Sequence, residues 1–194
     1  MSKLKIAVIL GSTRDSRFGI VPAKWITEVA KKRPELDVEL VDLKEYDLPL
    51  FNEMATNAWM PSSDPKAVAW QNKLGTFDGF IIVTPEYNHS ISGALKNAFD
   101  QAYKEWNNKP VAFVGYGMVG ASRAIEHARG IAVELHMVST RSAVSILGSD
   151  FVKVHPGMGK QPFATIEETI APSAKTMLDE LVWWGNATKA ARKA

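Results

Sequence analysis

The chain has 194 residues, 23 Lys and Arg against 21 Asp and Glu, a net charge of +2, and no cysteine. Its length predicts a single domain over residues 1–194 with a sizeable core. The lack of cysteine excludes disulfides, iron–sulfur clusters and cysteine nucleophiles, and the near-neutral charge argues against a nucleic-acid partner. The first apolar run, residues 6–10, is too short for a signal peptide or a membrane span, so we expect a cytoplasmic protein.

Short apolar runs alternate with helical patterns along the chain. The hydrophobic periodicity predicts strands at residues 5–10, 38–43, 80–84 and 111–115, and a fifth inside 137–147. It predicts helices at residues 18–32, 66–75, 92–103 and 121–135, and a last one from 166 toward 190. Pro22 fits the first of these helices because an N–H in the opening turn has no helical partner.

The third apolar run shows no alternation with polar residues, which is typical of a parallel strand covered by helices on both faces. Five strand–helix pairs in order predict an α/β fold of three layers, with a five-stranded parallel sheet in the order 2-1-3-4-5. In that order ligands bind at the carboxyl ends of the first and third strands, which are neighbours. We therefore expect the site in the loops after strands one, three and four.

The loop after the first strand, Gly11-Ser12-Thr13-Arg14-Asp15-Ser16-Arg17, is rich in hydroxyls and arginines. The free N–H groups at the start of the next helix favour an anion, and arginine binds phosphate through two hydrogen bonds. The spacing is not that of a Walker loop. The loop predicts a site for a phosphate monoester, with a solvated polar turn as the alternative.

The loop after the third strand has the sequence Thr84-Pro85-Glu86-Tyr87-Asn88-His89-Ser90-Ile91-Ser92-Gly93. Pro85 stiffens the exit from the strand, and Ser90 or Ser92 can cap the next helix. A turn followed by a cap does not account for the cluster Tyr87-Asn88-His89. We interpret this loop as a wall for the edge of a flat ligand.

The loop after the fourth strand, Gly115-Tyr116-Gly117-Met118-Val119-Gly120, matches Gly-x-Gly-x-x-Gly. A dinucleotide site also needs a carboxylate near the end of the next strand, and residues 137–147 contain none. We interpret the glycines instead as letting the backbone approach a planar ligand closely.

Gly11-Ser12-Thr13-Arg14 and the long motif at residues 84–100 together resemble the NADPH-dependent FMN reductase family of flavodoxin-like proteins, over roughly residues 4–150. The resemblance implies FMN at a dimer interface, with its phosphate on the first loop and its ring edges on the other two. The cofactor-binding residues that it implies are Ser12, Arg14, Ser16, Arg17, Phe18, Pro85, Glu86, Tyr87, Asn88, Gly115, Tyr116 and Gly117. Arg17 and Gly19 stand where many members have Ser and Asn, and Gly115 replaces a frequent hydroxyl residue.

The resemblance also implies the reaction. Hydride would pass from NADPH or NADH through bound FMN to a quinone, azo compound, free flavin or metal ion, by ping-pong kinetics and without a catalytic acid or base from the protein. The four histidines, at 89, 127, 136 and 155, lack metal-ligand spacing, so we expect surface or capping roles and no metal site. The alternative is a flavodoxin-type electron carrier, which the small positive charge disfavours.

The segment at residues 46–61 is too apolar for a plain surface loop. Our hypothesis is that it packs on a neighbouring subunit, in a homodimer or homotetramer, and walls the flavin site. The alternative is a loop folded over its own core.

Overall fold

The computed structural model describes residues 2–192. A short 3-10 helix, η1, follows β2 and another, η2, precedes α6. The strands and helices are β1 (Leu4–Leu10), α1 (Ile20–Lys31), β2 (Leu36–Asp42), η1 (Leu43–Tyr46), α2 (Pro65–Gly75), β3 (Gly79–Pro85), α3 (Gly93–Asp100), β4 (Pro110–Tyr116), α4 (Ser122–Glu134), β5 (Val138–Ser139), β6 (Val144–Ile146), α5 (Gly148–Val154), η2 (Phe163–Ile166) and α6 (Glu167–Ala191).

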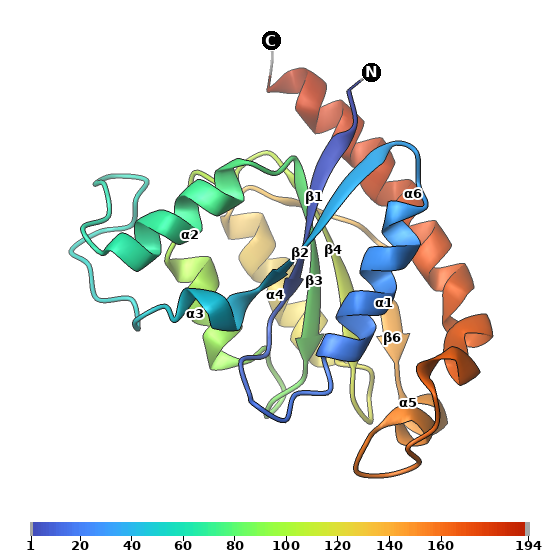
Figure 1. Ribbon diagram of the computed structural model, residues 1–194. Coiled ribbons are helices and arrows are strands. Elements are labelled where there is room, and N and C mark those ends of the chain that lie inside the picture. Colours follow the sequence, from blue (N-terminus) through green and yellow to red (C-terminus); the bar gives the residue numbers. More distant parts are fainter. Residues whose placement is uncertain (1, 193–194) are drawn as a thin grey trace.

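The sheet has the order β2-β1-β3-β4-β5, and every strand pair is parallel, which confirms the predicted topology. Helices α1 and α6 cover one face, and α2, α3 and α4 cover the other (Figure 1). All residues of β3 and β4 are buried, because helices exclude water from both faces of these central strands. No helix within residues 2–192 is long and apolar enough to cross a membrane.

The fifth strand differs from the prediction of a single strand inside residues 137–147. It is split into β5 and β6, which pair with the beginning and the end of β4 respectively. Between them the chain binds helix side chains: Arg129 of α4 donates to the carbonyl of Arg141 at 2.9 Å, and Glu180 of α6 accepts from the N–H of Ser142 at 3.0 Å. Because of these contacts, residues 141 and 142 do not pair with β4. The fifth strand is therefore interrupted, and the sheet contains six strands where five were predicted.

The helix starts differ in how they are capped. Asp64 accepts hydrogen bonds from the first turn of α2, and Ser92 Oγ accepts from the N–H of Leu95 at 3.1 Å, which confirms Ser92 as the cap of α3. Helix α1 begins after Gly19, which supplies no side-chain cap, and its first turn contains no acidic residue. Its positive dipole end is therefore left without a negative partner from its own helix.

The apolar segment at residues 46–61 extends away from the sheet past α2 and α3 (Figure 1). Asn97 of α3 holds it, donating to the carbonyl of Pro49 at 2.8 Å and accepting from the N–H of Phe51 at 2.9 Å. Yet Met54 is 92% exposed and Trp59 is 82% exposed. The segment is thus anchored to its own chain by polar contacts while its largest apolar side chains face outward.

Candidate functional site

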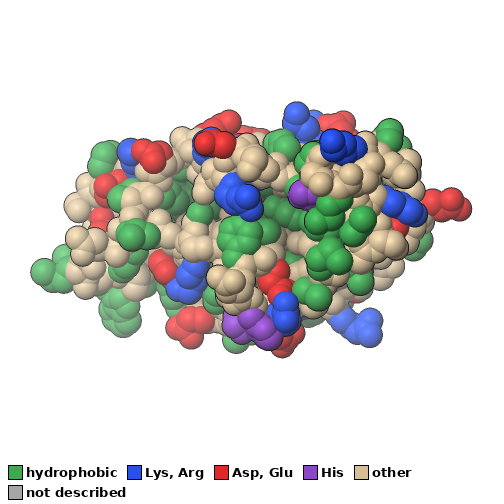
Figure 2. Space-filling model, turned by 90° about the horizontal axis from the view of Figure 1, so that it is seen from below, with side chains coloured by type: hydrophobic (Ala, Val, Ile, Leu, Met, Phe, Trp, Pro, Cys, Tyr) green, Lys and Arg blue, Asp and Glu red, His purple; other side chains and the backbone are tan. Residues whose placement is uncertain are grey.

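The three loops singled out in the sequence meet at the carboxyl edge of the sheet and line one cavity of about 480 Å³. Figure 2 looks onto this edge, where hydrophobic side chains lie in a central hollow and basic side chains stand beside it. Of the sequence-predicted residues, all except Asn88 and Gly115 line the cavity. The lining consists of Ser12, Arg14, Ser16, Arg17, Phe18, Pro85, Glu86, Tyr87, Tyr116, Gly117, Phe151, His155, Pro156 and Gly157.

The two arginines of the first loop have different surroundings. Arg17 forms an ion pair with Asp42, at the end of β2, and both side chains are mostly buried. Arg14 is exposed, forms no ion pair with any residue in 2–192, and has its guanidinium 6.0 Å from the centre of the Tyr87 ring. Arg14 therefore keeps its charge available for a ligand, whereas Arg17 holds the loop against the sheet.

Hydrogen bonds connect the first loop to the loop after β3 and to β3 itself. Ser12 is only 1% exposed, and its hydroxyl shares a hydrogen bond of 3.2 Å with that of Tyr87. Ser92 Oγ donates to the carbonyl of Gly11 at 2.7 Å, and the N–H of Gly11 donates to the carbonyl of Val83 at 2.9 Å. These contacts join the first loop to β3 and to Ser92 at the start of α3. The loop is therefore held in place by the protein itself.

The second loop closes in a tight turn. Tyr87 and Ser90 exchange backbone hydrogen bonds of 2.9 and 3.1 Å, and Asn88 and His89 between them have φ of 49° and 73°. Two successive residues with positive φ define a type I′ turn, in which Asn is favoured. The conformation thus gives Asn88 a role in shaping the turn, which presents Tyr87 to the cavity.

Glu86 ties this loop to α4. Its carboxylate forms an ion pair with Arg123 and accepts a hydrogen bond from the backbone N–H of Arg123 at 3.2 Å. Burial alone would raise the pKa of Glu86, but the hydrogen bonds and charge of Arg123 outweigh it and lower the pKa. Glu86 is therefore a carboxylate near neutral pH, and the pair fixes where Pro85 and Tyr87 lie.

The glycines of the third loop do not share one role, which corrects the interpretation that all of them admit a ligand. A Cβ on Gly115 would lie 2.3 Å from the carbonyl oxygen of Gly120, and a Cβ on Gly120 would lie 2.9 Å from the Cβ of Ser145. Both glycines let protein segments approach each other. Gly117, with φ of 138° and open space beside it, is the one that faces the cavity.

Aromatic rings form one side of the cavity. The ring of Phe18 lies 5.4 Å from that of Tyr116 and 5.5 Å from that of Phe151, both in edge-to-face packing. A Cβ on Gly19 would collide with the Tyr116 ring, so glycine at this position lets the start of α1 approach Tyr116. Burial raises the pKa of the Tyr116 hydroxyl, which therefore stays protonated and can donate a hydrogen bond.

Sequence reasoning missed the wall made by α5 and the turn after it, with Phe151, His155, Pro156 and Gly157. Helix α5 has only seven residues, which is too short for a clear helical period. A usable signal was topological: the strand before α5 ends at the same edge as β1, β3 and β4, so the loop after it belongs to the same ligand-binding edge.

Three comparisons with known proteins agree with this architecture. Residues 4–151 match the family model described as NADPH-dependent FMN reductase. An NAD(P)H-dependent FMN reductase of Nectria sp is 38% identical over 126 residues, 62% of this chain and 63% of that protein, a little under two thirds of its length.

A 2-hydroxy-1,4-benzoquinone reductase of Burkholderia sp is 35% identical and covers 70% of this chain and 73% of that protein. Among solved structures, the flavoenzyme NAD(P)H:(acceptor) oxidoreductase FerB of Paracoccus denitrificans shares the fold, with a TM-score of 0.71 and 22% identity over 95% of this chain and 98% of that one. The family model spans most of the chain, which therefore belongs to the NADPH-dependent FMN reductase family.

Proposed function

We propose that the protein is an NAD(P)H oxidoreductase that holds FMN in the carboxyl-edge cavity. The phosphate would lie at the N-terminus of α1 beside Arg14 and Ser16, and the ring along residues 85–88 and 116–117. The observation that carries this placement is a helix N-terminus without a side-chain cap beside Arg14, which has no ion-pair partner among residues 2–192, in a cavity of ordinary ligand size. Both features favour the binding of a phosphate monoester.

When bound, FMN supplies the acceptance and release of hydride, which no side chain provides. The chain's own residues bind and orient. Arg14 and the first turn of α1 would hold the anion, Tyr87 would border the ring, and Phe18 with Tyr116 would pack against the middle of the ligand. Because Glu86–Arg123 and the Tyr87–Ser90 turn are already formed, little ordering of the loop remains for binding.

For the acceptor, we propose a quinone. One NADPH and one proton would reduce it by two electrons to the hydroquinone, releasing NADP⁺. The name of the Burkholderia relative supports this class of acceptor. Azo compounds, free flavins and metal ions would take electrons from the same exposed face of the FMN ring. Since the same cavity mouth would serve both substrates in turn, we expect ping-pong kinetics.

We also propose that the protein works as a homodimer or homotetramer. The support is the segment at 46–61, which leaves Leu50, Met54 and Trp59 more than 80% exposed although Asn97 anchors its backbone. Exposed large apolar side chains on an anchored segment favour a contact with another copy of the chain. A monomer in size-exclusion chromatography at micromolar concentration would contradict this part.

The activity is tested by visible spectroscopy of the purified protein without oxygen. We expect the absorption bands of FMN, their bleaching on addition of NADPH alone, and their return on addition of benzoquinone. A second experiment varies both substrates, and parallel double-reciprocal lines are expected for ping-pong kinetics. A yellow protein that NADPH does not bleach would be an electron carrier, and a colourless protein that ignores added FMN would end the proposal.

A further inference from the structure

One wall of the cavity lies beyond the segment that the family model matches. The match ends at residue 151, whereas His155, Pro156 and Gly157 line the cavity from the turn that follows α5. The family model therefore says nothing about these three residues. This wall places the half-buried His155 at the cavity, whereas only surface or capping roles were expected from the sequence for the four histidines.

The turn that carries His155 is held tightly. The carbonyl of His155 accepts hydrogen bonds from the N–H groups of Met158 at 2.9 Å and Lys160 at 3.2 Å. The N–H of Gly159 donates to the carbonyl of Val152 at 2.9 Å. A Cβ on Gly159 would lie 2.5 Å from the carbonyl oxygen of Lys153, so only glycine allows this close return of the chain. The imidazole thus stands on a fixed support.

The orientation of the ring is also fixed. Its centre lies 5.6 Å from that of Phe18 and 5.0 Å from that of Phe151. The N–H of Gly157 donates to Nδ1 of His155 at 3.1 Å. A nitrogen that accepts a hydrogen bond carries no proton, so the neutral ring is assigned its proton on Nε2. Within residues 2–192 no acceptor is bonded to Nε2, which leaves a donor in a ring that lines the cavity.

The imidazole lies near the end of the cavity that carries Arg14 and the start of α1. Phe18, which packs on the imidazole, directly precedes Gly19 at the start of α1. The first turn of α1 and Arg14 are the groups to which the proposed function assigns the phosphate. His155 therefore reaches the same end of the cavity from the α5 side, opposite the loop that carries Arg14.

We propose that His155 is a phosphate-binding residue of this site, whose Nε2–H donates a hydrogen bond to the phosphate of bound FMN. The inference rests on the proposed function, since it assigns one more group to the same ligand. It also gives the α5 turn a role in selectivity, because this turn would distinguish FMN from riboflavin, which has the same ring and ribityl chain but no phosphate.

The test compares the affinities of the FMN-free protein for FMN and for riboflavin, measured by quenching of flavin fluorescence. His155→Phe keeps an aromatic ring between Phe18 and Phe151 but removes both nitrogens, and His155→Gln restores a donor. Lys153→Gln is the matched control, because it removes a cation from the same helix at a position outside the cavity lining.

We expect His155→Phe to weaken FMN binding about tenfold and riboflavin binding less than twofold, as for loss of one hydrogen bond to a charged group. His155→Gln should recover most of the FMN affinity, and Lys153→Gln should bind both flavins as the unmodified protein does. The riboflavin value shows that the variant still folds.

Equal loss of FMN and riboflavin affinity would make His155 a packing residue, and unchanged FMN affinity would remove it from the site; either result overturns the inference. An increase in KM for NADPH but not for NADH would assign His155 to the 2′-phosphate of the nucleotide, which also contradicts it. Failure of the unmodified protein to bind FMN would instead overturn the proposed function.

Discussion

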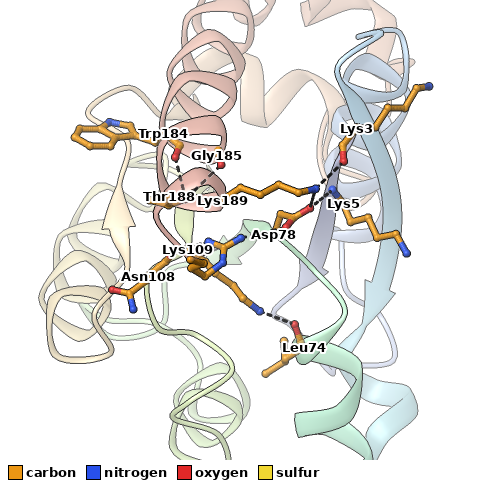
Figure 3. Close-up of polar contacts among 11 residues, drawn as sticks. Lys3, Lys5, Leu74, Asp78, Asn108, Lys109, Trp184, Gly185, Thr188 and Lys189 are labelled. Carbon is orange, nitrogen blue, oxygen red and sulfur yellow. Dashed lines mark hydrogen bonds and ion pairs between the residues drawn. The ribbon is translucent and has the colours of Figure 1, made fainter. Parts of the chain in front are cut away.

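Charged groups gather at both edges of the sheet, but Asp78 at the amino edge is paired within the chain, whereas Arg14 at the carboxyl edge forms no ion pair with any residue in 2–192. At the amino edge, Asp78 accepts hydrogen bonds from the N–H of Lys5 at 3.0 Å, from Lys189 at 2.7 Å and from Arg192 at 3.1 Å (Figure 3). Lys109 beside it donates to the carbonyl of Leu74 at 3.1 Å. At the carboxyl edge, Arg14 has no acidic partner within residues 2–192, and α1 has no cap.

We interpret this difference as one between groups that stabilise the fold and groups to which the proposed function assigns a ligand. The Asp78 cluster connects β1, the start of β3 and the end of α6, so its charges are satisfied by the folded chain itself. In the proposed function, Arg14 and the start of α1 gain their negative partner when the phosphate binds. Charged residues occur at both edges, and their hydrogen-bond partners distinguish the two.

The largest expected effect is on ligand binding. Arg14→Ala should raise the dissociation constant of FMN about 30-fold, equivalent to about 2 kcal/mol, because it removes a charge-assisted hydrogen bond to the phosphate. The free energy of unfolding without FMN should change little, since Arg14 is exposed and forms no ion pair with a described residue. Fluorescence titration and urea unfolding measure the two quantities.

Arg192→Ala is the matched control at the other edge. It should leave FMN affinity unchanged and lower the free energy of unfolding by about 1 kcal/mol, since the ion pair that it removes is partly buried. Weaker FMN binding in Arg192→Ala, or unchanged binding in Arg14→Ala, would break the proposed separation of the two edges.

Lys109 tests the cost of a buried charge. Burial, with a smaller contribution from Arg192, lowers its pKa to about 8, while Asp78 and Glu105 act in the opposite direction. In the unfolded chain this lysine keeps its proton up to about pH 10.4, so between the two pKa values the unfolded state binds more protons and stability rises with pH.

Lys109→Met should remove that rise and stabilise the protein at pH 7 by about 2 kcal/mol, after allowance for the lost hydrogen bond to Leu74. The measurement is the difference in free energy of unfolding between variant and parent from pH 7 to pH 10. A constant difference over this range would show that Lys109 keeps its proton in the folded protein.

Asp78 gives a smaller effect of the opposite sign. Burial would raise its pKa, but Lys189, the N–H of Lys5 and the charge of Arg192 together lower it. Its contribution to stability is therefore present above the unfolded pKa of about 3.9 and is lost as the pH falls through the folded value. Asp78→Asn should cost about 1 kcal/mol at pH 7 and nothing at pH 2, and an equal cost at both would show that its charge is irrelevant.

Much of the fold was predictable because the buried strands have simple patterns. The apolar run of β3 showed a strand covered on both faces, and the order of strand–helix pairs then led to the observed topology. The same topology predicted which loops meet, so Ser12, Arg14, Tyr87 and Gly117 were brought to one cavity as expected.

What the sequence could not show depends on contacts between distant segments. The role of Gly115 becomes clear only when Gly120 and Ala121 are seen to occupy the space beside it. The break between β5 and β6 depends on side chains of α4 and α6. Likewise, Arg14 and Arg17 look equivalent in the sequence until Asp42 is found to pair with only one of them.

The most direct test of the account is a crystal structure of the protein with FMN. We expect the phosphate oxygens within hydrogen-bond distance of the Arg14 guanidinium and the N–H of Ile20, the first residue of α1, with the ring against Tyr87. A flavin seated instead in the neighbouring cavity beside Lys44 and Asn97, or bound with its phosphate turned away from α1, would contradict the central claim.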